Sequence, residues 1–241
     1  MFPIINIGPL AIQSPGLIFI IGLWVGLWIA EKYLSDSGID SNTFNNLVFL
    51  TLMLGIVGGR ITYAIQHADA FILDPFSLVS LNTNLFDLRG GLFFAFFAGL
   101  IYGGRKELDL WQTLDALTPL LGILAIALGL SNLASGSNFG VLSNLPWAVE
   151  LWGVKRHPTQ LYQIIISVLI LFILWPGRAV VKKLDPGQYF LLFAAASSAG
   201  YIFIAKFTAN INLLVSGFRL EQIFAWLILA LSLWGFNLRS K

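Results

Sequence analysis

Seven apolar segments, separated by short polar stretches, run through most of this chain. A helix that crosses a membrane needs about 20 mostly apolar residues, and helices or closed barrels are the only structures that span lipid. We therefore expect an all-α, polytopic membrane protein. Its spans are predicted at residues 17–30, 47–66, 91–102, 117–133, 161–175, 188–205 and 222–236. The third span is short, so we expect its helix to borrow residues on both sides.

The charge content of the chain agrees with a membrane protein. Charged residues make up 11% of the sequence, whereas soluble domains carry roughly 25%. Mean hydropathy is +0.82. Twelve acidic and fourteen basic side chains are too few to coat a soluble surface, so we predict a single transmembrane helical domain over residues 1–241.

Several kinds of chemistry are excluded or disfavoured by residue usage. The chain has no cysteine, which excludes disulfides, a thiol nucleophile and a cysteine-based metal site. Two histidines and scattered carboxylates give no reason to expect a metal centre. The basic residues are few and fall on both sides of the predicted membrane, so we expect no nucleic-acid partner.

The distribution of basic residues predicts the orientation. An odd number of spans puts the two termini on opposite sides of the membrane, and cytoplasmic loops carry an excess of Lys and Arg. Compact basic pairs occur at 105–106 and 182–183, whereas the loop 67–88 contains three Asp and no Lys or Arg. We therefore predict an external N-terminus and a cytoplasmic C-terminus.

Two polar clusters interrupt the second and third spans. Arg60 and Tyr63 lie near the predicted outer end of the second span, and Arg89, Gly90 and Gly91 open the third. A guanidinium group offers a fork of donors that fits a phosphate, so both arginines are candidates for binding a lipid headgroup. The alternatives are a structural role for the first arginine and an ordinary interfacial position for the second.

Small and amide side chains crowd the outer end of the fourth span. Asn132 and Gly136 belong to this stretch, which is suited either to line a headgroup pocket or to pack helices closely. Just before the last span, we expect Glu221 to pair with Lys206 or Arg219 at the membrane interface.

The fifth span opens with the run Arg-His-Pro-Thr-Gln-Leu-Tyr at 156–162. A proline at this place favours a helix start. His157 and Tyr162 are candidates for proton transfer, and Arg156 and Gln160 are candidates for binding a headgroup. The alternative is that this histidine only supports the scaffold through hydrogen bonds.

Taken in order, these motifs resemble the prolipoprotein diacylglyceryl transferase family. The resemblance covers most of the chain and rests on Gly58-Gly59-Arg60 with Tyr63, Asp74-Pro75, Gly90-Gly91, Asp115 with Pro119, Asn132, Gly136, Gly140, Pro146-Trp147-Ala148, the 156–162 run and Gln222. It implies transfer of the diacylglyceryl group from phosphatidylglycerol to the lipobox cysteine of a prolipoprotein, without a cofactor. It also implies a multi-pass protein of a bacterial-type inner or thylakoid-like membrane.

The sequence departs from the family pattern at several reactive positions. Arg89 stands where the family has a histidine, Gly129 where it has an arginine, and Ser137 where it has a glutamate. The arginine and glutamate of the sixth span fall on Tyr201 and Ala205. A second hypothesis is therefore a non-catalytic relative that binds lipid or serves as a subunit of a membrane complex. A transporter is a distant third, because no internal repeat is evident.

Overall fold

The computed structural model describes residues 4–7, 10–73, 85–209 and 219–240. Within them the chain is mostly helical and divides into two compact units, Met1–Ser37 with Trp111–Lys241, and Gly38–Leu110. The predicted all-α architecture is confirmed, and each of the seven predicted spans falls on a helix. Asp74 and Pro75 lie outside the described residues. The predicted single domain over residues 1–241 and the orientation of the termini stay predictions.

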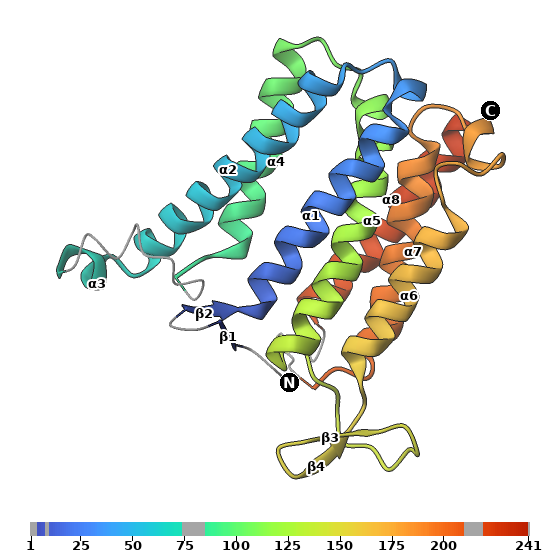
Figure 1. Ribbon diagram of the computed structural model, residues 1–241. Helices are drawn as coiled ribbons and strands as arrows, with labels where there is room; N and C mark the ends of the chain where they lie inside the picture. The colour runs from blue at the N-terminus through green and yellow to red at the C-terminus, as the bar shows by residue number, and fades with distance from the viewer. Residues whose placement is uncertain (1–3, 8–9, 74–84, 210–218, 241) are drawn as a thin grey trace. The chain divides into compact units, whose positions relative to one another are not determined.

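The larger unit is a bundle of five long helices, which lie side by side in Figure 1. They are α1 (Ser14–Lys32), α5 (Leu110–Ser135), α6 (Thr159–Ile173), α7 (Gln188–Ala205) and α8 (Leu220–Arg239). The unit also contains the short turns η1 (Leu34–Ser37) and η3 (Val181–Lys183). The start of α1 and the end of α8 lie at opposite ends of this bundle (Figure 1).

Two small antiparallel hairpins belong to the same unit. Strands β1 (Ile4–Ile7) and β2 (Leu10–Gln13) pair directly before α1. Strands β3 (Val149–Leu151) and β4 (Val154–Arg156) pair between α5 and α6 and project beyond the ends of these helices (Figure 1). The tight turn between β3 and β4 places Gly153 at a φ of 76°, a conformation that favours glycine.

Small residues let α1 and α5 approach each other closely. A Cβ added to Gly22 would lie 2.4 Å from the Cβ of Ala127, and one added to Gly26 would lie 2.7 Å from Leu120 Cδ1. In lipid, such small-residue seams bring backbones together and allow extensive van der Waals contact. Close packing therefore contributes to holding α1 against α5.

The smaller unit is a helical hairpin. It consists of α2 (Ser41–Gln66), the short α3 (Ala68–Leu73) and α4 (Leu88–Arg105), and α2 packs along α4. Asp40 caps α2 by accepting a hydrogen bond from Thr43 N at 3.0 Å. The observed α4 extends the predicted span 91–102 on both sides, as expected.

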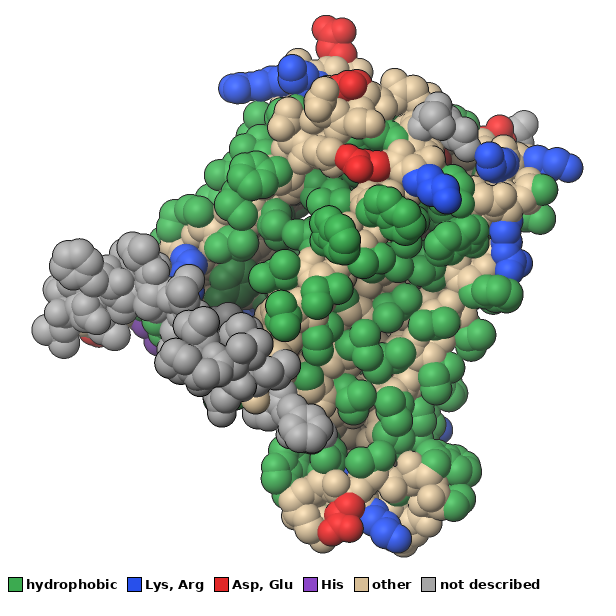
Figure 2. Space-filling view, in the orientation of Figure 1, with side chains coloured by type: hydrophobic (Ala, Val, Ile, Leu, Met, Phe, Trp, Pro, Cys, Tyr) green, Lys and Arg blue, Asp and Glu red, His purple; other side chains and the backbone are tan. Residues whose placement is uncertain are grey.

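Five of the described helices, α1, α2, α5, α7 and α8, are long and apolar enough to cross a membrane. Helix α6 is equally apolar but has only 15 residues. In Figure 2, apolar side chains cover the flanks of the helices, while Lys, Arg, Asp and Glu gather at the ends. This distribution is that of a polytopic membrane protein.

The fourth predicted span, 117–133, lies within α5, which begins earlier, at Leu110. Its first two turns carry Gln112, Thr113 and Asp115, whose polarity resembles that of a loop. The carboxylate of Asp115 in these turns accepts hydrogen bonds from the start of α7, so this polar side chain is satisfied within the bundle.

Candidate functional site

His157 and Tyr162 meet at the start of α6. The hydroxyl of Tyr162 lies 3.2 Å from His157 Nδ1 and accepts a hydrogen bond from Trp147 Nε1 at 2.9 Å. The ring of Phe207 packs against both side chains, at centroid distances of 4.9 Å to His157 and 6.0 Å to Tyr162. Helix α6 begins directly after Pro158, as predicted. The two residues predicted for proton transfer are therefore in contact.

The backbone around His157 is held from two sides. His157 N donates to Val141 O at 3.0 Å, and Val141 N donates to Phe207 O at 2.8 Å. A Cβ added to Gly140 would lie 2.3 Å from His157 O, so only glycine fits at this place. Arg156 reaches the same segment, since its Nη1 donates to Gly140 O at 3.3 Å and its guanidinium stacks over the ring of Phe139. Arg156 thus supports the segment that carries the histidine.

Gln160 fixes the turn that follows α5. It is only 1% exposed, and its Nε2 donates to Ser137 O at 2.8 Å. Thr159 donates to the neighbouring Asn138 O. Gly136, with a φ of 79°, allows the chain to turn after α5. Gln160 and Gly136, both predicted to bind a headgroup, therefore have an evident structural role.

A cavity of about 420 Å³ opens between α5, α6, α7 and the start of α8. Ligand pockets typically enclose about 300–1,000 Å³. Asn132 lines it, is 8% exposed, and donates from Nδ2 to Gln163 Oε1 at 3.2 Å. Polar residues from the helix ends near the β3–β4 hairpin share the lining with apolar residues from further along the helices. The polar lining includes Asn132, Asn138, Thr159, Gln163, Tyr201, Thr208, Arg219 and Glu221, and the apolar lining includes Ala125, Leu128, Ile166, Ile170 and Ile204.

The charged end of this cavity comes from α7 and α8. Tyr201 Oη donates to Glu221 Oε2 at 2.9 Å, and Arg219 Nη1 donates to the carbonyl of Ala205, the last residue of α7. The sequence pointed to Lys206 or Arg219 as the partner of Glu221 and did not identify Tyr201. The two residues are 20 positions apart on different helices, so no spacing rule connects them. Arg219 was likewise not predicted as a site residue.

The other predicted headgroup-binding residues belong to the smaller unit. Gly90 and Gly91 lie in the first turn of α4 and face α2, and Arg89 beside them is exposed. Tyr63 stacks on His67 at a centroid distance of 4.2 Å.

Arg60 lies in the second half of α2 and is partly buried. The structure thus brings the predicted residues together in two sets, one in each compact unit.

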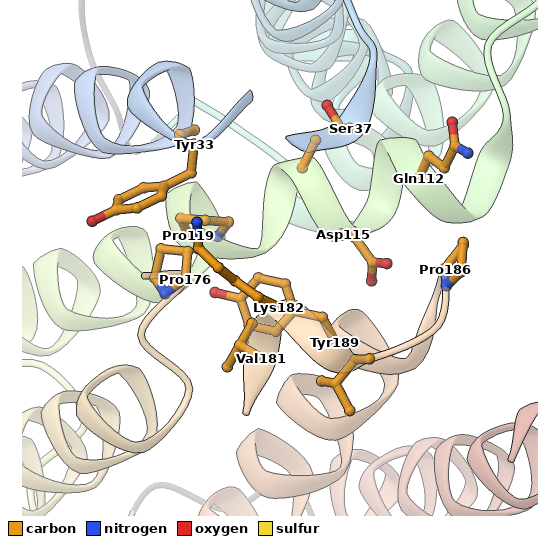
Figure 3. A pocket seen from close by; sticks show the side chains of 13 residues that line it. Tyr33, Ser37, Gln112, Asp115, Pro119, Pro176, Val181, Lys182, Pro186 and Tyr189 are labelled. Atoms are coloured by element: carbon orange, nitrogen blue, oxygen red, sulfur yellow. The ribbon is translucent and has the colours of Figure 1, made fainter. Parts of the chain in front are cut away.

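A second, smaller cavity of about 190 Å³ lies at the other end of the larger unit (Figure 3). Asp115 extends from α5 toward the start of α7 and accepts hydrogen bonds from Gly187 N at 2.6 Å and Phe190 N at 2.8 Å. This carboxylate therefore caps α7, where it also favourably meets the positive end of the helix dipole. Within the described ranges, no three His, Asp or Glu side chains converge as metal ligands would.

The sequence pattern of the prolipoprotein diacylglyceryl transferase family matches residues 3–238. The chain belongs to this family. Members of the prolipoprotein diacylglyceryl transferase family are multi-pass bacterial membrane proteins, in agreement with the long apolar helices.

Three relatives are all phosphatidylglycerol–prolipoprotein diacylglyceryl transferases. The one from Aliivibrio fischeri is 29% identical over 177 residues, which cover 71% of this chain and 64% of the relative. The one from Bordetella parapertussis is 27% identical over 97% of this chain and 92% of its own length. The one from Staphylococcus aureus is 27% identical over 95% and 85%. For the first of these, the match spans slightly less than two thirds of the relative's length.

Proposed function

We propose that the protein transfers the diacylglyceryl group of phosphatidylglycerol to the thiol of the lipobox cysteine in a prolipoprotein. The observation that carries this proposal is the cavity lined by Asn132, which combines a polar end with apolar walls. A phospholipid has the same division between headgroup and acyl chains. The family relationship over residues 3–238 supports the same reaction.

The reaction breaks one bond and forms one bond. The sulfur of the cysteine attacks the diacylglyceryl carbon that carries the phosphate, so a C–S bond forms and a C–O bond breaks. The electron pair of the broken bond stays on the leaving glycerol phosphate. The thiol proton must be removed, and a positioned general base contributes about 10²–10⁴-fold to such a step.

His157 is the base that we assign. When Nδ1 carries the proton and donates it to the hydroxyl of Tyr162, this contact orients the ring and leaves Nε2 free to accept the thiol proton. The lining of the cavity includes Thr159, two positions after His157, and this supports a role for the histidine near the lipid. The thiol itself comes from the substrate, because this chain has no cysteine.

We place the protein in the bacterial inner membrane or a thylakoid-like membrane, with its C-terminus in the cytoplasm. Its macromolecular partner in this proposal is the prolipoprotein. A partnership with other membrane proteins belongs to the non-catalytic hypothesis, which the departures at Arg89, Gly129 and Tyr201 motivate.

A reconstituted transfer assay tests the proposal. Purified protein in nanodiscs containing phosphatidylglycerol is mixed with a synthetic lipobox peptide, and the thioether product is measured by mass spectrometry. The expected result is product that requires both the protein and the peptide cysteine, with a Cys-to-Ser peptide as the control. Product no greater than in empty nanodiscs would contradict the proposal and would favour a lipid-binding relative without catalysis.

A further inference from the structure

An arginine that the family pattern does not supply lies at the polar end of the lipid cavity. Arg219 directly precedes α8 and lines the cavity together with Asn132 and Tyr201. Its side chain is partly buried, and Nη1 donates to Ala205 O at the end of α7. The guanidinium is therefore tied to one wall of the cavity.

We infer that Arg219 binds the phosphodiester of the lipid substrate and stabilises the glycerol phosphate as it leaves. This inference rests on the proposed function, because it names the residue that holds the phosphate in that reaction. A guanidinium group has five N–H donors in a planar fork, and one of them suffices for the carbonyl of Ala205. The remaining face of the fork matches two oxygens of a phosphate.

The charge change in the reaction makes this contact catalytic. The phosphodiester carries one negative charge, and the departing monoester gains a second as the C–O bond breaks. A cation aimed at the place where charge develops stabilises the transition state more than the ground state. Removal of the Arg219 side chain is thus expected to lower kcat as well as to raise KM.

Position explains why this residue can take over from the arginines of the family pattern. Gly129 and Tyr201 occupy those two positions in this chain, and Tyr201 lines the cavity. Arg219 reaches the same cavity from a different helix. A cation at the polar end is thereby retained although its place in the sequence has changed.

Glu221 provides an internal control. It lines the same cavity, and Tyr201 Oη donates to its Oε2. A carboxylate near the phosphate repels an anionic lipid. Removing the charge of this carboxylate should therefore not weaken the binding of the lipid. The isosteric Glu221→Gln keeps an oxygen that can accept from Tyr201, and therefore changes charge with little change of shape.

The test compares Arg219→Gln, Arg219→Lys and Glu221→Gln in the nanodisc transfer assay. Loss of a charged hydrogen bond corresponds to about tenfold or more in kcat/KM. We expect that loss for Arg219→Gln, with both kcat and KM affected, and a smaller loss for Arg219→Lys, which keeps the charge but not the fork. Glu221→Gln should lower KM for phosphatidylglycerol, because it removes a negative charge from the end of the cavity that holds the phosphate. Thermal melting and gel filtration confirm that each variant is folded.

Binding of short-chain phosphatidylglycerol, measured calorimetrically, separates this inference from the proposed function. Wild-type protein that binds the lipid through Arg219 but forms no thioether would contradict the proposed reaction and leave the phosphate contact standing. Active wild-type protein together with a folded, fully active Arg219→Gln variant would overturn the inference alone. In a second set of measurements, inorganic phosphate and glycerol 1-phosphate compete with short-chain phosphatidylglycerol for binding. If they bind as tightly as the lipid does, the site is one for free phosphate and the assignment to lipid is overturned.

Discussion

Gly140 lies against the backbone of His157 so closely that a Cβ on the glycine would fall 2.3 Å from the histidine carbonyl oxygen. The obstructing atom belongs to the main chain and cannot rotate away. The residue without a side chain and the candidate base are therefore parts of one local arrangement.

Gly140→Ala should accordingly move the segment that carries His157. We expect a loss of about 1–3 kcal/mol in stability, as for other overpacked sites, and a fall in transfer activity. Thermal melting in detergent and the thioether assay measure the two effects. Gly103→Ala is the matched control, because no atom lies within 4 Å of its added Cβ. Equal melting temperatures for the two variants would show that the contact with His157 is not tight.

Tyr162→Phe should reduce kcat more than Trp147→Phe does. The first change removes the hydroxyl that contacts both His157 and Trp147, whereas the second leaves the pair of His157 and Tyr162 intact. Each hydrogen bond contributes about 0.5–1.5 kcal/mol to stability, so neither variant should unfold. Steady-state kinetics give the comparison. An equal or larger effect of Trp147→Phe would indicate that Tyr162 does not act through the histidine.

Asp115→Ala should destabilise the larger unit by about 2 kcal/mol or more, because both hydrogen bonds to the start of α7 are lost. Asp115→Asn keeps one accepting oxygen and should lose less. The exposed Asp185 provides the control variant, Asp185→Asn. The melting temperatures of the three variants test the capping role. An Asp115→Ala protein as stable as Asp185→Asn would refute it.

Gly90→Ala should separate the two long helices of the smaller unit. The added Cβ would lie 2.1 Å from Thr62 Oγ1, and that hydroxyl is held by its hydrogen bond to Gly58 O at 2.8 Å. We expect faster amide hydrogen exchange in α2 and α4, with little change in α6 to α8. Gly104→Ala, in the same helix but with open space around it, is the comparison. Unchanged exchange in Gly90→Ala would contradict the prediction, because it would show that α2 and α4 accommodate the added Cβ without separating.

The helices were predictable because lipid requires long apolar runs, and such runs are visible in the sequence. The contact between His157 and Tyr162 was also within reach, since the two lie five positions apart around a helix start. The early start of α5 was hidden because Asp115 makes its first turns polar while bonding to a helix 72 positions further along.

The charged end of the cavity lined by Asn132 and Tyr201 could not be deduced in the same way. Tyr201, Arg219 and Glu221 come from two helices and the point where the second begins. Their proximity is set by the packing of α7 on α8, which leaves no periodic trace in the sequence. In the sequence, this region was indicated only by two charged residues, Arg219 and Glu221, directly before an apolar segment.

Helix α6 has consequences for the surrounding bilayer. Its 15 residues span about 22 Å at 1.5 Å per residue, while the hydrocarbon layer is about 30 Å thick. Lipids beside a short helix respond to this mismatch by locally thinning the layer. This local thinning would bring headgroups closer to the bilayer centre beside α6. A lipid substrate would then reach the cavity by lateral diffusion, without leaving the leaflet.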